Sequence, residues 1–389
     1  MSMVMTADAS LANSNNHLAP EEDNSSGFNE RWGREAELMH HYCTVTADTL
    51  AMREDMRHVW KVVKPREGYA CAFVMHGILS ISALHKGLLV PSERQRYLDL
   101  SAHYYLIGSE AFRACLPHVN MENWRQVLCF TTIIILHCLS LPARSGKQGL
   151  QTPIRRVLEL FSVVRGIRAT IDPFTRLITA SEFAPIVYGI WPPTDVKNTQ
   201  RYVCLFILQP HILHSPFQFI ARLDIRNVVQ SLILFTPSLL DVSHCGLPVD
   251  TFDALQRLRS LSISSVSRTS ASPYSAGDSE HYTAAIDGLE TATRLIAWGG
   301  AHAEIGTVLY WPYVLDQSIM ADIEASEPAA LVILAHFAVL FKCLGMKHWY
   351  TKGWTERLFK DIDRQLIKWE GRASWLEWPC KHIYCTEPF

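Results

Sequence analysis

The sequence predicts an all-α protein, a large helical bundle enclosing an apolar pocket, and three observations predict the helices. Hydrophobic residues make up 48% of the 389 residues and charged residues only 19%, which is enough apolar material for a large core. From Glu30 onward the apolar spacing is helical nearly everywhere. A strand is suggested only at residues 228–235, which lack a hairpin partner. We therefore predict one helical ligand-binding or catalytic domain over residues 30–389, built as one body or as two lobes.

Residues 1–29 form a polar segment rich in Ser, Asn, Asp and Glu, and this composition predicts a disordered leader. The segment opens without the apolar stretch of a signal peptide. The ten cysteines are scattered and include no C-x-x-C pair, which is typical of free thiols in a reducing compartment. These features favour an intracellular, cytoplasmic protein.

A long helix is predicted at residues 92–116. From Tyr97 onward, apolar and aromatic side chains recur along one stripe of such a helix. Ser92 and Gln95 fit a capping box at its start, and Pro117 predicts its end.

Further helices are predicted at residues 290–297, 329–344 and 355–369. Ser326-Glu327-Pro328 is a start signal for the second of these, and Gly345 is its stop signal. Loops are predicted at residues 143–152, 191–198 and 264–280, which contain Gly, Pro and polar residues. The last of these loops is rich in Ser and is expected at the surface.

The charge pattern argues against binding to nucleic acid. Lys and Arg number 36 and Asp and Glu number 38, for a net charge of −2, and no segment forms the basic cluster that binds phosphates. The longest apolar runs, residues 128–141 and 329–344, are shorter than the roughly 18–20 residues that span a bilayer. We therefore predict buried core helices and no membrane span.

Sequence motifs for metal, nucleotide or nucleophilic chemistry are absent. The chain has no H-E-x-x-H, Walker A, G-x-G-x-x-G or G-x-S-x-G motif. Asp361-Ile362-Asp363 lacks the further carboxylate of an Asp-rich magnesium motif, as does Asp322-Ile323-Glu324. His40-His41 and the His211/His214 pair each lack a third ligand at fitting spacing. We predict no metal site and no cofactor.

Three histidines lie within apolar helical segments, and they are the candidate catalytic residues: His137, His336 and His76. An imidazole in such a place is either hydrogen-bonded in the core or faces a cavity. The core interpretation is the commoner one for each. His85 follows His76 by nine residues, about half a turn out of phase, so the two cannot face the same pocket.

Large aromatic side chains near predicted helix ends are the candidate substrate-binding residues: Tyr310, Trp311, Trp354 and, within the helix over residues 92–116, Tyr105. Most such residues belong to a core. A cavity for a rigid polycyclic or macrocyclic hydrocarbon would be walled by the same kind of side chain.

Several stretches of the chain resemble the C-terminal ligand-binding region of fungal zinc-cluster transcription factors, in particular the sterol uptake control proteins. The similarity runs from about residue 37 to residue 369. This resemblance implies an all-α bundle that takes a sterol into an apolar pocket and can form a homodimer. The stretches are YACAFVMHGILSISALHK (69–86), YLDLSA (97–102), LPHVNMENW (116–124), IIILHCLSLPARS (133–145), ALVILAHF (330–337) and WYTKGW (349–354).

The departure from that family concerns DNA binding. Those regulators carry an N-terminal six-cysteine zinc cluster, whereas residues 1–29 contain no cysteine and Cys43 stands alone. A DNA-binding role is therefore not carried over. At the position of His137 the family more often has an aromatic residue such as Tyr, so this histidine is a departure on what the resemblance implies is a pocket-lining helix.

The chain is also similar in size to free-standing fungal hetero-Diels–Alderases of tropolonic sesquiterpene biosynthesis. This second resemblance implies the addition of a tropolone o-quinone methide to a humulene-type terpene, forming a dihydropyran ring without a cofactor. A donor such as His137 would polarise the tropolone oxygen or assist the loss of water that generates the quinone methide.

Two functions from different classes follow from these features. The first is a cofactor-free cyclase of meroterpenoid biosynthesis, a hetero-Diels–Alderase. The alternative is a sterol- or metabolite-sensing regulatory module without its own DNA-binding domain, which would be nuclear and act through dimerisation. A truncated regulator without activity is a third, less favoured hypothesis. The expected ligands are hydrophobic small molecules: a terpene, a tropolone or a sterol.

Overall fold

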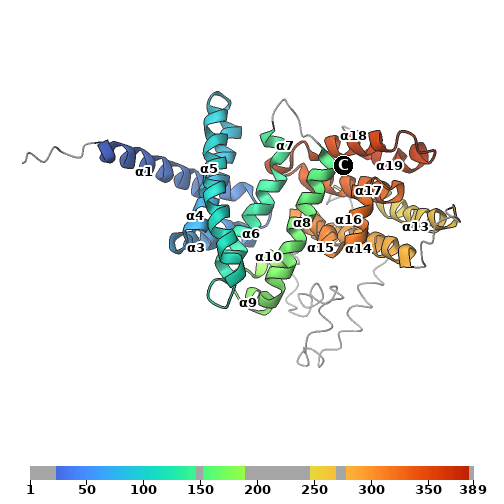
Figure 1. The fold of residues 1–389 in the computed structure, drawn as a ribbon, viewed down its shortest axis with the longest axis horizontal. Coiled ribbons are helices and arrows are strands. Elements are labelled where there is room, and N and C mark those ends of the chain that lie inside the picture. The colour runs from blue at the N-terminus through green and yellow to red at the C-terminus, as the bar shows by residue number, and fades with distance from the viewer. Residues whose placement is uncertain (1–22, 146–151, 189–245, 269–276, 385–389) are drawn as a thin grey trace, which may run out of the picture.

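The computed structural model describes residues 23–145, 152–188, 246–268 and 277–384. Every element in these ranges is a helix and none is a strand (Figure 1), which confirms the predicted all-α class. The predicted strand at residues 228–235 and the predicted loop at residues 191–198 lie outside the described residues.

The first half of the described chain runs from helix α1 to helix α10. Its main helices are α1 (Asp23–His41), α2 (Glu54–His58), α3 (Lys64–Ala70), α4 (Ala72–Leu89), α5 (Arg94–Cys115), α6 (Trp124–Leu139), α7 (Leu141–Arg144), α8 (Pro153–Ile171), α9 (Thr175–Thr179) and α10 (Ala184–Tyr188). Short π- and 3₁₀-helical segments lie between them: η1 (Tyr42–Thr46), η2 (Ala47–Thr49), η3 (Val59–Val63), η4 (Pro91–Glu93), η5 (Leu116–His118) and η7 (Asp172–Phe174).

The second half of the described chain folds around α17. It consists of α13 (Thr251–Arg268), α14 (Gly277–Gly299), η12 (Gly300–His302), α15 (Ile305–Val314), α16 (Gln317–Glu324), α17 (Pro328–Gly345), η13 (Trp349–Thr351), α18 (Trp354–Gln365) and α19 (Arg372–Tyr384). Helix α17 contacts α13, α14, α15, α16, α18 and α19.

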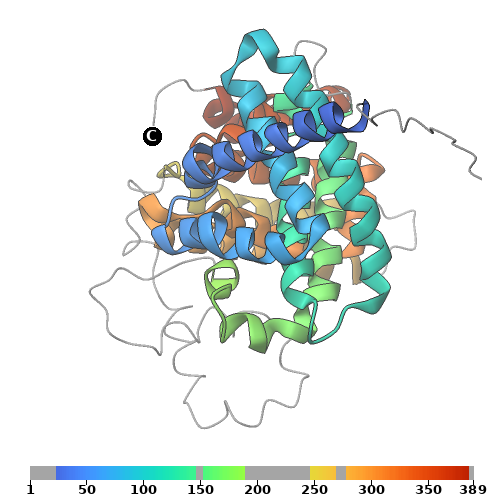
Figure 2. The same cartoon turned by 90° about the vertical axis from the view of Figure 1, so that its left-hand side faces the viewer.

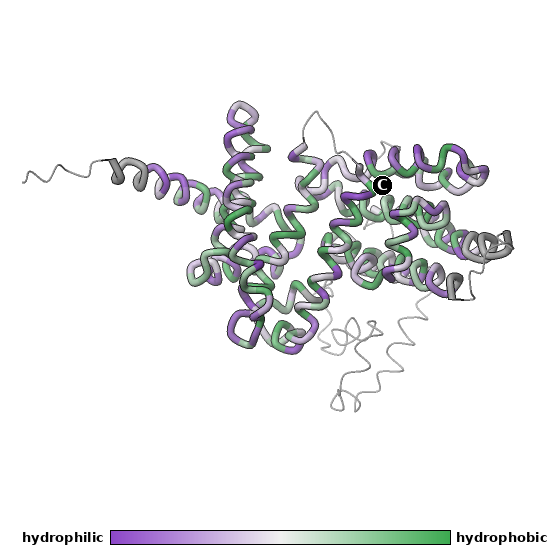
Figure 3. The backbone as a smooth tube through the Cα atoms, in the orientation of Figure 1, coloured by the Kyte–Doolittle hydropathy of each residue, from purple (hydrophilic) through white to green (hydrophobic). Residues whose placement is uncertain are grey.

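The two halves meet at α6 and α8. Helices α4 and α5 form a hairpin at one end of the molecule and α1 projects from it, whereas the C-terminal helices gather at the other end (Figures 1 and 2). Helices α6 and α8 lie between them, and α8 contacts α15, α16 and α18. A hydrophobic cluster with residues from both halves extends from Tyr42 to Ile383. Figure 3 shows polar residues along the projecting part of α1 and hydrophobic residues where helices meet.

Helix α17 has the start and stop that the sequence predicts. Pro328 occupies its first turn, where a missing N–H costs nothing, and the helix ends at Gly345. By length and composition, α4 and α17 are each long and apolar enough to cross a membrane. In the structure 61% of the apolar window of α4 and 89% of that of α17 are buried, which is the packing of core helices.

Helix α5 is confirmed, but the capping box predicted at its start is wrong. Pro91 opens a 3₁₀ turn, so the helix begins at Arg94 after Glu93, and no side chain caps its N-terminus. Its end agrees with the prediction, because α5 stops at Cys115 and Pro117 lies in the following turn.

Helices extend into several segments that the sequence predicts to be irregular. Helix α1 begins at Asp23, within the predicted leader, and residues 1–22 lie outside the described chain. Helix α13 reaches Arg268 and α14 begins at Gly277, so both enter the predicted Ser-rich loop. Between α7 and α8, Thr152 has a positive φ of 50° before Pro153, consistent with the loop predicted there.

Two helical glycines provide a matched test of this packing. An alanine Cβ at Gly108 in α5 would lie 2.8 Å from Phe130 Cε2 and 3.1 Å from the Phe73 carbonyl oxygen, whereas at Gly166 in α8 it meets nothing within 4 Å. We expect Gly108→Ala to lower the free energy of unfolding by about 1–3 kcal/mol and Gly166→Ala to raise it by about 0.5–1 kcal/mol. Urea unfolding measures both, and equal effects would contradict the packing of α5 against α6.

Candidate functional site

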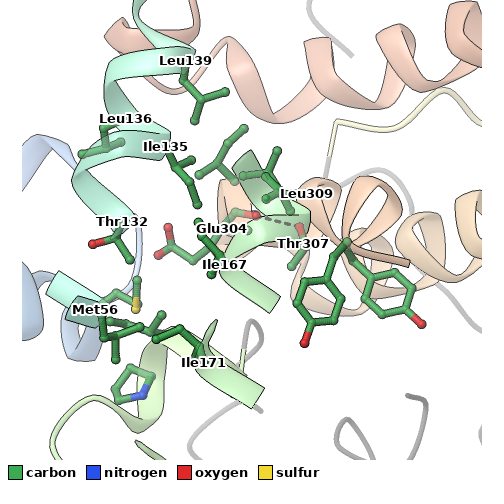
Figure 4. A pocket seen from close by; sticks show the side chains of 18 of the residues that line it. Met56, Thr132, Ile135, Leu136, Leu139, Ile167, Ile171, Glu304, Thr307 and Leu309 are labelled. Carbon is green, nitrogen blue, oxygen red and sulfur yellow. Dashed lines mark hydrogen bonds between the residues drawn. The ribbon is translucent and has the colours of Figure 1, made fainter. Parts of the chain in front are cut away.

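A cavity of about 290 Å³ lies where α6, α8 and α15 meet (Figure 4), near the lower end of the range of about 300–1,000 Å³ for small-molecule pockets. Segments around α2, η3, η7 and α10 complete its wall. The lining residues are mostly aliphatic or aromatic: Leu50, Met56, Trp60, Leu128, Thr132, Ile135, Leu136, Leu139, Val164, Ile167, Arg168, Ile171, Asp172, Thr175, Pro185, Ile186, Leu295, Glu304, Ile305, Gly306, Thr307, Leu309, Tyr310, Tyr313 and Tyr350.

Helical periodicity places the apolar wall. Helix α6 contributes residues spaced three, four or one apart along one face: Leu128, Thr132, Ile135, Leu136 and Leu139. Helix α8 contributes Val164, Ile167, Arg168 and Ile171 in the same way. Residues at these spacings share one side of a helix, so the two faces meet across the cavity.

Glu304 brings a carboxyl group into this apolar cavity. It precedes the first turn of α15, and only 4% of its surface is exposed. Its Oε1 atom accepts hydrogen bonds from the backbone N–H of Met52 at 2.8 Å and of Arg53 at 2.7 Å. Figure 4 shows the carboxyl directed toward the side of the cavity formed by Thr132 and Met56.

The remaining oxygen of Glu304 is the polar atom open to a ligand. Within the described residues, Oε2 has no hydrogen-bond partner. Burial raises the pKa of Glu304 to about 7, against the opposing effect of the two backbone N–H donors. A substantial fraction of the side chain is therefore protonated at neutral pH, and a protonated carboxyl can donate a hydrogen bond or a proton.

The hydroxyl groups of three other lining residues, Thr307, Thr132 and Tyr350, already donate hydrogen bonds within the protein. Thr307 donates to the Glu304 carbonyl oxygen at 2.7 Å, and Thr132 donates to the Cys129 carbonyl oxygen at 2.7 Å. Tyr350 donates to the Leu50 carbonyl oxygen at 3.3 Å. Glu304 is consequently the best-placed donor for a ligand among these groups.

Polar residues at one edge of the cavity bind one another. Tyr313 donates to Asp172 Oδ1 at 2.6 Å, and Arg168 donates to the Tyr313 carbonyl oxygen at 3.2 Å. The Arg168 Nε atom lies 3.6 Å from Asp172 Oδ2, and the Asp172 side chain is 46% exposed. This edge is therefore the solvent-facing part of the site.

The structure places His137 in the core and outside the cavity lining. Its Nε2 atom lies 2.6 Å from Ser80 Oγ, which itself donates to the Ser101 carbonyl oxygen at 2.8 Å. His137 therefore donates to Ser80 and carries its proton on Nε2. Its ring stacks on Tyr105 at 3.8 Å. Burial lowers its pKa well below 6.5, so the ring is neutral and held between neighbours.

The other two candidate histidines also lie outside the cavity lining. His336 donates from Nδ1 to the Val332 carbonyl oxygen at 2.9 Å and stacks on Trp378, and burial lowers its pKa to about 4. His76 is half-buried and stacks on Tyr104. His85 stacks on Trp349 instead, so the two rings contact different neighbours, in agreement with their spacing.

Of the four candidate aromatic residues, Tyr310 lines the cavity. Trp311 is fully buried and donates from Nε1 to the Ala285 carbonyl oxygen at 2.8 Å. Trp354 is also buried and donates to the carbonyl oxygen of Leu139 at 2.6 Å, behind the lining rather than in it. These two side chains are core residues in the structure. Tyr105 is partly buried, stacks on His137 and lies outside the cavity lining.

Glu304 is the residue that sequence reasoning missed, although the sequence contains a signal for it. It is the only Asp, Glu, Lys or Arg between Arg294 and Asp316. A charged residue alone in such an apolar stretch is either at the surface or in a functional cavity. What distinguishes these two cases is the contact of Glu304 with Met52 and Arg53. Those residues lie about 250 positions earlier in the chain, so a local pattern does not show the contact.

Metal ligands do not cluster in the described part of the chain, where no group of three or more His, Cys, Asp or Glu side chains could hold a metal ion. His211 and His214, the pair that lacks a third ligand in the sequence, lie outside the described residues. No family model matches the chain and no curated protein matches it, so interpretation of the cavity depends on its geometry.

Proposed function

We propose that this cavity binds a hydrophobic, terpene-sized molecule and that the chain is a cofactor-free cyclase. The reaction proposed is the hetero-Diels–Alder addition of a tropolone o-quinone methide to a humulene-type terpene. The observation that carries the proposal is a protonatable carboxyl, Glu304, in an otherwise apolar cavity. Glu304 thereby takes the donor role that the sequence assigns to His137.

The proposed chemistry needs positioning and one donor. The faces of α6 and α8 would hold the hydrocarbon, and orientation of two partners converts their encounter into an effectively unimolecular step. A protonated Glu304 would assist loss of water from a hydroxymethyl tropolone by donating its proton to the departing hydroxyl. The carboxylate would then take up the proton that the tropolone hydroxyl releases as the neutral quinone methide forms. The same carboxyl in hydrogen-bonded form would polarise the tropolone oxygen during addition.

The second candidate function is a sensor of a sterol or another apolar metabolite, and one observation favours it. The Glu304 carboxyl holds the backbone of Met52 and Arg53 while facing the cavity. A ligand that competes for this carboxyl would loosen the segment between η2 and α2, so occupancy would be transmitted to the N-terminal half of the chain.

Incubation of the full chain with a hydroxymethyl tropolone and humulene distinguishes these functions. The cyclase proposal expects a single stereoisomer of the adduct that forms only in the presence of the protein, measured by chiral chromatography and mass spectrometry. A racemic adduct at the uncatalysed rate contradicts it. Binding of terpene or sterol without turnover supports the sensor.

Filling the cavity tests where the ligand binds. Ile135 points into the cavity from α6 (Figure 4), so Ile135→Trp is expected to occupy the ligand volume. We expect humulene affinity, measured by thermal shift, to fall by about tenfold or more, which is about 1.4 kcal/mol. The control is Leu106→Trp on α5, an exposed site outside the lining, which should leave affinity unchanged. Unchanged affinity in Ile135→Trp would place the ligand elsewhere.

A further inference from the structure

Lys64, at the first position of α3, is fully buried, which is rare for a lysine. Its Nζ atom lies 3.2 Å from the centroid of the Trp60 ring and donates a hydrogen bond to Thr132 Oγ1. Among the described residues, no other acceptor binds this amine. An ammonium group has three donors, and here its surroundings in the described chain offer one hydrogen bond and the face of the Trp60 ring.

The two side chains that contact the Lys64 amine both line the cavity. Trp60, within η3, and Thr132, on α6, each form part of the wall. The amine is therefore separated from the cavity by one layer of side chains. Lys64 does not itself line the cavity, so contact with a bound ligand requires its flexible stem to rotate and exchange the Thr132 contact for the cavity.

Burial also favours the uncharged form of the Lys64 amine. Burial lowers the pKa of Lys64 to about 7, whereas an exposed lysine has a pKa of about 10.4. A large fraction of Lys64 is consequently uncharged where surface lysines are protonated. A neutral amine beside an apolar pocket is the usual arrangement of a lysine that attacks carbonyl carbon.

We propose that Lys64 forms an imine with an apolar aldehyde or ketone bound in the cavity. The amine lone pair attacks the carbonyl carbon, a C=N bond replaces the C=O bond, and the oxygen leaves as water with the two amine hydrogens. No oxidant, reductant or cofactor is needed. This inference rests on the proposed binding of apolar molecules in the cavity and is independent of the cycloaddition.

Reductive trapping tests the imine. The full chain is incubated at neutral pH with farnesal, an apolar aldehyde, and cyanoborohydride, and the adduct is located by peptide mass spectrometry. We expect one dominant adduct at Lys64, its loss in Lys64→Met, and its retention in Lys61→Met, which changes an exposed lysine on the preceding turn. Excess humulene should suppress the adduct by occupying the cavity.

Three results would overturn the inference. The first is labelling spread over surface lysines, and the second is an adduct that persists in Lys64→Met. The third is binding of humulene, seen as a rise in Tm, without any adduct at Lys64, which would leave cavity binding intact and remove only the imine. If Lys64→Met does not fold, the unsubstituted chain still tests the imine. Peptide mass spectrometry then shows whether the adduct lies at Lys64, and competition with humulene shows whether it forms in the cavity. Absence of both humulene binding and the adduct contradicts the proposed function itself.

Discussion

Glu304→Gln is expected to lower the rate of adduct formation by about 10²–10⁴-fold, the usual contribution of a general acid, and to leave the fold intact. The amide oxygen of glutamine can still accept the backbone hydrogen bonds of Met52 and Arg53 that the carboxylate accepts at 2.8 and 2.7 Å. The amide cannot release a proton to a departing hydroxyl. The measurement is the initial rate under saturating tropolone and terpene, together with Tm.

The pH dependence of the same reaction separates acid catalysis from packing. The folded chain raises the pKa of Glu304 from 4.5 to about 7. The rate should therefore be high below pH 7 and fall as the pH rises through about 7, because the carboxyl loses its proton. Glu304→Gln should remove this decline, whereas Glu324→Gln, at an exposed carboxyl, should keep both rate and profile. A rate within twofold of the unsubstituted chain in Glu304→Gln would exclude the acid role.

Acid is expected to unfold the chain at a mildly low pH, because several histidines are buried in their neutral form. Burial lowers the pKa of His85, His336 and His348 to about 4 and that of His137 well below 6.5. In the unfolded chain each titrates near 6.5. The unfolded state therefore binds more protons as the pH falls below 6.5, and the free energy of unfolding decreases between about pH 6.5 and 4.

The expected loss is several kcal/mol in total, since one pKa unit corresponds to about 1.4 kcal/mol. Glu304 acts in the opposite direction: its raised pKa stabilises the fold below 4.5, and this contribution is lost as the pH rises through about 7. Four histidines outweigh one carboxyl on the acid side. Thermal melts between pH 7.5 and 4.5 measure the slope.

A matched pair of variants assigns this slope to buried histidine. His348 is buried and stacks on Tyr350 at 4.9 Å, so His348→Phe keeps the ring and removes the titration. It should reduce the loss of stability between pH 6.5 and 4.5. His103→Gln, at an exposed position on α5, should not. A free energy of unfolding that stays constant over this range would contradict neutral burial of the histidines.

The sequence predicts a helix correctly where the residues that define its face and its ends lie close together in the chain. The apolar stripe of α5 and the Pro328 and Gly345 boundaries of α17 depend on residues within a few turns of each other, and these elements agree with the structure. The capping box at Ser92 and Gln95 is wrong because Pro91 fixes a 3₁₀ turn ahead of it. Pro91 and Ser92 each mark a possible start, and the sequence pattern alone does not show which of the two determines where the helix begins.

The candidate site depends on contacts that a local pattern does not contain. Three apolar-helix histidines have the same sequence signature, and the fold turns each toward a core partner, such as Ser80 for His137 and the Val332 carbonyl for His336. Glu304 becomes a cavity residue because the chain brings Met52 and Arg53 to its carboxyl. Tyr310 reaches the lining, whereas Trp311, its neighbour, faces Ala285 on the other side of α15.

We propose that the cavity between α6, α8 and α15 is the binding site for an apolar molecule. A crystal structure of the full chain grown with humulene tests it most directly. We expect ligand density in contact with Ile135, Ile167 and Leu309, within reach of the Glu304 carboxyl (Figure 4). Humulene bound only at another place, or an unoccupied cavity at a saturating humulene concentration, would contradict this proposal.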